Sequence, residues 1–196
     1  MIFSYCIQQV TGAWKVMNGR AEGLQELDLT LEGFWRSFGA VILIIPFTLI
    51  AISSERIALT ATDQAVTVLA GSFVSLRLFG LALDWIAFPI FFALVARPLG
   101  VSTHYVPFIV ARNWSAVVIA GMFALPHALH ATGFVPLPVL SFLLLALFVV
   151  ALRFSYLVVR TALAVPVMMA VPVVLLQLLI GILIEVSLDR IFVGVM

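Results

Sequence analysis

The stretch between Arg77 and Arg97 constrains the fold more than any other part of the sequence. Nineteen residues separate the two arginines, and Asp84 is the one charged residue among them. As a helix, this run would extend roughly 28 Å, about the thickness of the hydrocarbon core of a bilayer. An ionised carboxylate at that depth costs about 2.5–3.5 kcal/mol, so we expect Asp84 to be neutralised, paired or turned inward.

The composition of the whole chain points the same way. Hydrophobic residues make up 64% of the sequence and charged residues 10%, whereas a soluble domain has roughly 25% charged residues. The apolar runs are continuous rather than alternating, which favours helices over a β-barrel. The net charge of +1 gives no basis for nucleic-acid binding. The single cysteine, Cys6, excludes an internal disulfide and a cysteine-based metal site.

The hydropathy pattern predicts an all-α, polytopic integral membrane bundle of five transmembrane helices. Residues 1–33 form a polar N-terminal segment, and residues 34–196 form one transmembrane domain. The polar stretch 53–64 is predicted to be a loop, and 65–76 a partly embedded prelude to the second span. The predicted spans are residues 34–52, 77–97, 106–125, 139–158 and 166–186.

The N-terminal segment contains a short amphipathic pattern. Ile7, Val10, Trp14 and Met17 recur at helical spacing and give one apolar face. This predicts a helix that either lies on the membrane surface or packs on the bundle as a cap, and the pattern favours neither. Downstream, Thr30 or Asp28 is expected to cap the next helix. No basic segment followed by a cleavage site is present, so we expect no cleaved signal peptide.

Basic residues predict the orientation of the bundle. Seven of them fall on the N-terminal side of the five predicted spans and three on the other, which places the N-terminus in the cytoplasm and the C-terminus on the opposite side. We expect a bacterial inner (cytoplasmic) membrane as the location. The first group is Lys15, Arg20, Arg36, Arg97, Arg112, Arg153 and Arg160, and the second is Arg56, Arg77 and Arg190.

Polar residues inside apolar spans are the first candidates for a site, because they are costly in a bilayer. Asp84 has three possible roles: a structural ion pair, part of a water-filled or proton-linked path, or exposure near the outer interface. From its expected depth in the outer half, its candidate partners are Arg77, His127, Gln177 and Glu185, while Arg112 could reach it only by extending outward. The full set of candidates is Arg77, Asp84, Arg112, Asn113, Gln177 and Glu185.

Two further groups of side chains share helix faces. His127 and His130 are three apart at the exit of the third span, and Glu185 and Asp189 are four apart at the exit of the fifth. Histidine and carboxylate on adjacent helices can bind a metal. Paired histidines at a helix exit are more often ordinary interface residues, so we predict no metal and no cofactor and keep His127, His130 and Glu185 as metal candidates.

Arg153, Tyr156 and Arg160 form one stripe at the inner surface. They could hold anionic lipid headgroups, or they could simply anchor the helix by the positive-inside rule with snorkelling side chains.

No signature of catalysis is present. The sequence contains no nucleophile elbow, Walker loop, HExxH or kinase motif. We therefore expect a protein that is not an enzyme. Small residues at Ala116, Ala120 and Ala124, with Gly121, form a face in the third span that would let another helix approach closely.

The layout resembles the Yip1-like family of small five-span membrane proteins. The resemblance lies in GFWRSF at 33–38 after a polar head, the prompt re-entry VPFIVARNW at 106–114, and the hinge RFSYLVVRTALAVP at 153–166. It is a resemblance of topology and carries no site residues over. It implies a non-enzymatic bundle with a role in membrane organisation, trafficking or assembly.

Two functions follow from these patterns. The first is a scaffold or an accessory subunit of a membrane protein complex, with the lipid bilayer and other membrane subunits, or further copies of itself, as partners. The alternative is a small oligomeric transporter or channel for ions or small solutes, favoured by the proline-broken helices and by Asp84, Gln177 and Glu185.

Overall fold

The computed structural model describes residues 2–61 and 70–193, and within these residues the chain is helical and contains no strand. The described elements follow one another along the chain as α1 (Ile2–Met17), η1 (Ala21–Gln25), α2 (Leu31–Phe38), α3 (Val41–Ala61), α4 (Ala70–Ala96), η2 (Ser102–His104), α5 (Tyr105–Ala131), α6 (Leu137–Ala162) and α7 (Val167–Val193).

Within residues 2–61 and 70–193, five helical stretches are long enough and apolar enough to cross a membrane, as the sequence predicts. They are Leu31–Leu59, Phe73–Ala96, Ser102–Ala131, Leu137–Ala162 and Val167–Arg190. These five apolar helices suggest a membrane protein.

One predicted boundary was wrong. α3 continues to Ala61, through the first part of the stretch expected to be a polar loop. The polar residues at its end have partners on other helices: Ser54 is fully buried, and Glu55 pairs with Arg77 of α4. Residues 62–69, where the rest of the expected loop and the first part of the prelude fall, lie outside the described residues. α4 already begins at Ala70, seven residues before the predicted start of the second span.

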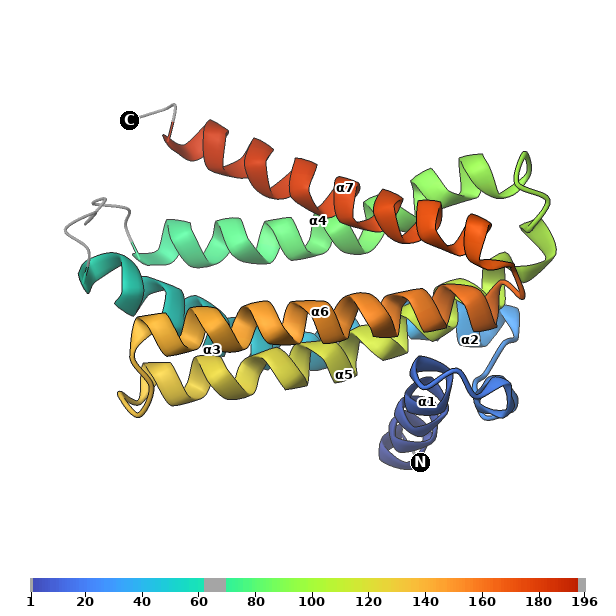
Figure 1. Ribbon diagram of the computed structural model, residues 1–196, viewed down its shortest axis with the longest axis horizontal. Helices are drawn as coiled ribbons and strands as arrows, with labels where there is room; N and C mark the ends of the chain where they lie inside the picture. The colour runs from blue at the N-terminus through green and yellow to red at the C-terminus, as the bar shows by residue number, and fades with distance from the viewer. Residues whose placement is uncertain (1, 62–69, 194–196) are drawn as a thin grey trace.

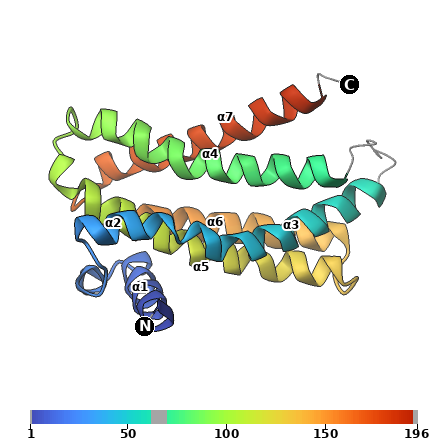
Figure 2. The ribbon, with the colours of Figure 1, turned by 180° about the vertical axis from the view of Figure 1, so that it is seen from behind.

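The long helices form two layers. α5 packs on both α3 and α6, whereas α7 packs on α4 and α6. Figure 1 shows α3, α5 and α6 in one layer, with α4 and α7 side by side above it, and Figure 2 shows the same layers from behind. Successive long helices alternate in direction, so α1 and the end of α7 lie at opposite ends of the bundle. We call the end that carries α1 and α2 the cap end, and the other the far end.

Aromatic side chains fill the core at the cap end. Phe88, Phe92 and Phe108 are fully buried, and the ring of Phe92 lies 4.8 Å from that of Phe108. Tyr105 stacks on Phe92 and donates a hydrogen bond to the carbonyl of Pro89 at 2.9 Å. Edge-to-face and offset-stacked rings pack densely, so this part of the bundle between α4 and α5 is well filled.

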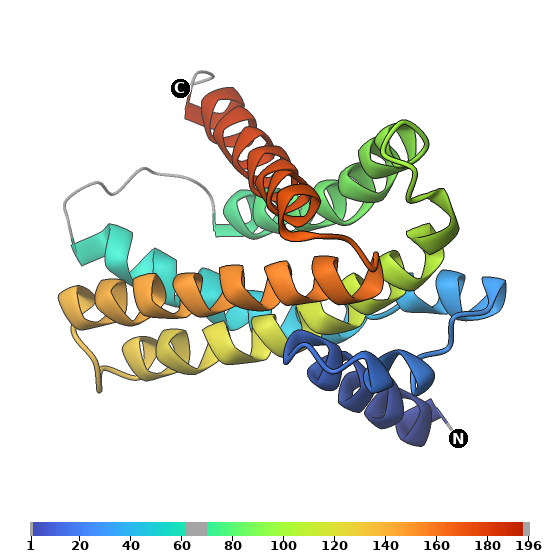
Figure 3. The same cartoon turned by 45° about the vertical axis from the view of Figure 1, so that its right-hand side comes forward.

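The N-terminal helix packs on the bundle. α1 lies across the cap end and contacts α5 and α6 (Figure 3), which is the cap arrangement of the two that the sequence left open. The face that packs overlaps the expected one at Met17 and, in part, at Val10. Ile7 and Trp14 are 51% and 46% exposed. The buried residues of α1 are Gln9, Gly12, Ala13, Val16 and Met17.

Polar contacts and two glycines hold the cap together. The buried side chain of Gln9 accepts a hydrogen bond from the backbone N–H of Asp28 at 2.9 Å and donates to the carbonyl of Glu26 at 3.3 Å. Gly12 of α1 faces Gly23 of η1 so closely that a Cβ on Gly12 would lie 2.9 Å from the Gly23 carbonyl oxygen. The two backbones can meet at this distance only because neither residue has a side chain.

The cap also fixes the start of α2. The hydroxyl of Thr30 accepts a hydrogen bond from the backbone N–H of Gly33 at 3.0 Å, which confirms Thr30 as the N-cap. The same hydroxyl donates to Asp28 at 2.6 Å, and this bond lowers the pKa of the Asp28 carboxyl, with burial acting in the opposite direction. Burial first, and then the negative charge of Asp28, raise the pKa of Tyr5, whose hydroxyl lies 3.4 Å from that carboxylate.

Candidate functional site: a charged pocket between α3, α4 and α7

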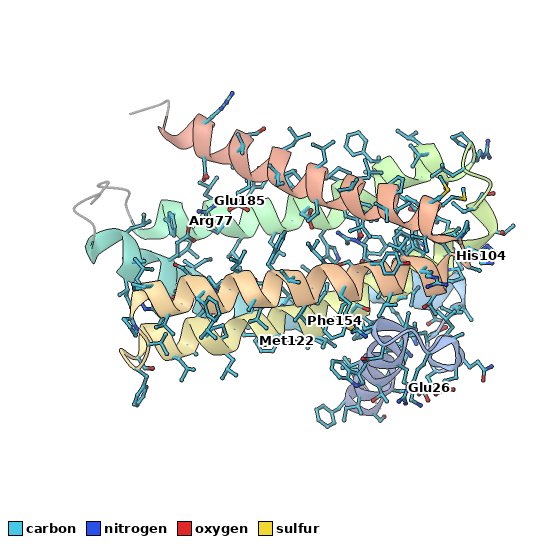
Figure 4. The ribbon with its side chains drawn as sticks, viewed as in Figure 1. Glu26, Arg77, His104, Met122, Phe154 and Glu185 are labelled. Atoms are coloured by element: carbon cyan, nitrogen blue, oxygen red, sulfur yellow. The ribbon has the colours of Figure 1, made fainter. Side chains whose placement is uncertain are left out.

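Charged side chains from three helices meet around Arg77. Its Nη2 pairs with Glu55 of α3, and its Nη1 lies 2.6 Å from Glu185 Oε1 and 3.4 Å from Asp189 Oδ1, both on α7. Figure 4 shows Arg77 and Glu185 reaching toward each other from α4 and α7. One guanidinium therefore links three helices near the far end, with the planar fork that suits several carboxylates at once.

A pocket of about 410 Å³ opens beside this cluster. Two glycines contribute to its space: Gly80 on α4 and Gly181 on α7. A Cβ on Gly181 would lie 3.7 Å from Asp84 Oδ1, an ordinary contact distance, so the pocket has room at this point. The pocket is lined by Thr48, Ala51, Ile52, Glu55, Arg77, Gly80, Leu81, Asp84, Gly181, Ile184, Glu185 and Leu188.

Asp84 forms the deeper charged point of the pocket. Its Oδ2 lies 3.3 Å from Nη2 of Arg112 on α5. The side chain of Arg112 is 13% exposed, and its guanidinium carbon lies 4.6 Å from the centre of the Phe88 ring. The ion pair ties the α4–α7 layer to the α3–α5–α6 layer, and the aromatic face adds a cation–π contact.

The partner of Asp84 is not among the four that its expected depth favoured. Because α4 begins at Ala70, Asp84 stands near the middle of the helix rather than in its far-end half. α5 runs beside it in the opposite direction, and this brings Arg112 to the same level. Of the three possible roles of Asp84, the structure shows the ion pair.

Toward the cap end, the pocket gives way to tightly packed aromatic residues. Trp85, 5% exposed, follows Asp84 directly on α4, and Phe88, fully buried, lies one turn beyond it. The indole N–H of Trp85 donates to the carbonyl of Phe38 at 3.1 Å. The pocket therefore ends at the Asp84–Arg112 pair.

Two other predicted polar residues lie elsewhere. Asn113 is fully buried and donates from Nδ2 to Ser37 Oγ at 3.0 Å, which joins α5 to α2. Gln177 of α7 lines a shallow surface pocket together with Glu185, and its buried Oε1 has no hydrogen-bond partner within the described part of the chain.

The metal candidates have separate partners. His127 Nδ1 lies 3.1 Å from Ser54 Oγ, His130 Nδ1 lies 2.8 Å from the carbonyl of Val135, and Glu185 pairs with Arg77. Across residues 2–61 and 70–193, no group of three histidine, cysteine, aspartate or glutamate residues is placed to hold a metal ion.

The basic stripe of α6 lies at the cap end. Arg153 and Arg160 are exposed, and the guanidinium of Arg153 stands 5.7 Å from the ring of Phe154. Phe154 in turn meets Trp14 of α1 at 5.7 Å between ring centres. The stripe, with half-buried Tyr156, therefore borders the N-terminal cap.

Glu55 is the one charged residue of the pocket that the sequence analysis did not select. The sequence pattern assigned Glu55 to a polar loop. Extending the first predicted helix past Ile52 would have placed Glu55 on a span facing Arg77.

Comparison with family models, with curated proteins and with solved structures found no match for the chain. The resemblance to the Yip1-like family stays a prediction.

Proposed function

We propose that this chain is a non-enzymatic integral membrane protein that acts as a scaffold or as an accessory subunit of a membrane protein complex. The proposal rests on one observation: charged side chains of the long helices pair with charged side chains of neighbouring helices. Arg77 joins α3, α4 and α7, and the Asp84–Arg112 pair joins the two layers. Interior charges that link helices to one another support an architectural role.

The outer surface of the bundle supports the same proposal. Large apolar side chains are exposed on α4, α6 and α7, where lipid tails or the helices of another subunit would cover them. These side chains are Phe79, Leu83, Ile86, Ile90 and Leu94 on α4, Phe142, Leu145 and Val149 on α6, and Leu175, Leu179, Ile182, Leu183 and Val186 on α7.

Native purification in a mild detergent tests this function. A scaffold or accessory subunit is expected to co-purify with the same membrane proteins in fixed stoichiometry, after solubilisation at more than one detergent concentration. Recovery of the chain only by itself, with the same result after cross-linking in the membrane, would contradict the proposal.

A transporter or channel for ions or small solutes is the second candidate, and the charged pocket favours it. Intramembrane charges beside a cavity often mark a transport path. An oligomer of the purified chain that moves ions or solutes across liposome membranes would support this function, and the absence of flux in tightly sealed liposomes would count against it.

The cap suggests how the protein would sit in its membrane. We place the N-terminus in the cytoplasm and the C-terminus outside, in a bacterial inner membrane, on the basis of the positive-inside rule. α1 would then lie near the inner surface with Trp14 directed to the interface, and Arg153 and Arg160 would meet anionic headgroups. A role in membrane organisation of the kind that the Yip1-like family implies fits this placement.

A further inference from the structure

We propose that the pocket between α3, α4 and α7 binds a compact organic ammonium ion, a positively charged amine with a short apolar body. This inference goes beyond a scaffold function, which requires no ligand. It concerns binding alone and holds whether or not the protein transports what it binds.

The charge around the pocket is not balanced by the protein. Glu55, Asp84 and Glu185 line it together with Arg77. Including the nearest partners outside the lining, Asp189 and Arg112, four carboxylates face two guanidinium groups. The side chains of these carboxylates are 36–64% exposed, and their excess of negative charge attracts a cation. The pocket therefore favours a positively charged occupant.

The shape and walls of the pocket favour an organic cation over a metal ion. Its volume of about 410 Å³ is within the range of pockets that hold small organic ligands. Within the described ranges no three ligating side chains are arranged for a metal. The walls between the charged groups are aliphatic, formed by Ala51, Ile52, Leu81, Ile184 and Leu188. The ammonium group of such an amine matches the carboxylates of the lining, and its short alkyl body matches the aliphatic walls.

The carboxylates offer acceptors at two depths. Asp84 uses Oδ2 for Arg112, whereas its Oδ1 lies on the side of Gly181, next to open space. Glu185 holds Arg77 through Oε1 and is 64% exposed near the far end. An ammonium group has three donors, so it can bridge toward Asp84 while the alkyl body lies between α4 and α7.

The same chemistry could come from a free amine or from the ethanolamine headgroup of a lipid. Both present a primary ammonium group, and the pocket opens between helices that lipid would surround. The experiment below separates these two sources.

Calorimetric titration of the purified full chain in detergent tests the proposal, with butylammonium chloride as the probe and butanol as its neutral counterpart. We expect saturable binding of butylammonium and none of butanol. Repeating the titration in nanodiscs separates the sources: weaker binding in phosphatidylethanolamine than in phosphatidylcholine identifies the headgroup as a competitor, and equal binding identifies a free amine. No binding of butylammonium, or equal binding of butanol, would overturn the proposal.

Two variants with a matched control link the binding to the pocket. Glu185→Gln is expected to weaken butylammonium binding about tenfold, because it removes a charged acceptor. Glu32→Gln is the control, since Glu32 is likewise an exposed carboxylate paired with an arginine but lies in α2 at the cap end, away from the pocket. Gly181→Leu should abolish binding by filling the pocket without a change of charge.

Size-exclusion chromatography and thermal unfolding confirm that each variant keeps the folded bundle, and Gly181→Val replaces Gly181→Leu if the larger side chain destabilises it. Equal weakening by Glu185→Gln and Glu32→Gln would overturn the assignment to this pocket. So would undiminished binding in a folded variant whose pocket has been filled.

Discussion

Arg112 has the most demanding environment of the charged residues in the described chain. Its guanidinium lies over Phe88, is 13% exposed, and has Asp84 as its carboxylate partner. A cation in such a place depends on its partner, because an unpaired charge in a desolvated site costs more than the pair contributes. The stability of the junction between the two helix layers is therefore expected to depend on this pair.

Asp84→Asn should lower the free energy of unfolding by about 2 kcal/mol, since it leaves Arg112 without its counter-charge. The partial opening of Asp84 to the pocket keeps the effect below that of a fully buried pair. Unfolding in mixed detergent micelles, followed by tryptophan fluorescence, measures the change.

The double variant Asp84→Asn with Arg112→Gln is the control for this prediction. It removes both charges and should recover most of the lost stability. If the double variant is no more stable than Asp84→Asn alone, the loss of the ion pair does not explain the destabilisation.

At the residue scale, the sequence indicated an ion pair as one of three possible roles of Asp84, and its candidate partners did not favour Arg112. The cost of a carboxylate within an apolar run can be derived from composition alone. The partner depends on where α4 begins, and the seven residues between Ala70 and the predicted start shift the depth of Asp84 toward Arg112. Glu55 was missed for a related reason, because a polar stretch can continue a helix when its side chains find partners on neighbouring helices.

At the scale of elements, the backbones of α1 and η1 are in close contact where the two helices cross. A Cβ on Gly23 would lie 2.5 Å from the Gly12 carbonyl oxygen and 2.9 Å from the backbone nitrogen of Val16. Both obstacles are backbone atoms, which cannot move aside as a side-chain end can. The cap can form in this way only with glycine at this position.

Gly23→Ala is therefore expected to displace η1 from α1 and to destabilise the cap by about 1–3 kcal/mol, the cost of forcing extra atoms into a packed contact. Limited proteolysis of the cap, compared between the variant and the parent protein, measures the loss.

Gly121→Ala provides the matched control, because a Cβ on Gly121 would meet the Phe47 ring at 3.6 Å, an ordinary contact. This variant should resist proteolysis as the parent does. Equal protection of Gly23→Ala and Gly121→Ala would contradict the role assigned to the glycine contact.

Hydrophobic periodicity alone did not predict how α1 packs. Of the predicted face, Met17 is buried whereas Ile7 and Trp14 stay exposed, and the buried face of α1 also includes Gln9 and Gly12. Small side chains permit the close approach, and Gln9 supplies hydrogen bonds that the chain from Glu26 to Asp28 needs. Hydrophobic periodicity takes into account neither the close approach that small side chains permit nor the hydrogen bonds of a buried polar side chain.

At the scale of the whole molecule, the five long helices alternate in direction, and this arrangement fixes which loops share a side. The loop at His104 joins α4 to α5 at the cap end, and the loop at Thr132 follows α5 at the far end. Both residues are exposed. In a bilayer the two loops would be separated by its full thickness.

Single cysteines at these two positions test the topology. In a Cys6→Ser background on intact bacterial cells, a membrane-impermeant thiol reagent should label Thr132→Cys and leave His104→Cys unlabelled until the membrane is permeabilised. Labelling of both positions in sealed cells would contradict the spanning arrangement, and labelling of His104→Cys alone would reverse the proposed orientation.

The number of long apolar helices could be predicted because each apolar run is individually long enough to span a bilayer. Their arrangement in two layers could not, since lipid-facing and helix-facing surfaces are both apolar and leave little contrast in the sequence. The small-residue face at Ala116, Ala120 and Ala124 indicated only that α5 would have a close neighbour. The structure makes α5 the helix that α1, α2, α3 and α6 all contact.

The docking of α1 has a consequence for the order in which the protein assembles. α1 leaves the ribosome before α5 and α6, which make the surface that it covers. Contacts between such distant segments form late, after the intervening helices are in place. During synthesis the packing face of α1, with Ala13, Val16 and Met17, therefore stays uncovered until α6 has reached its position.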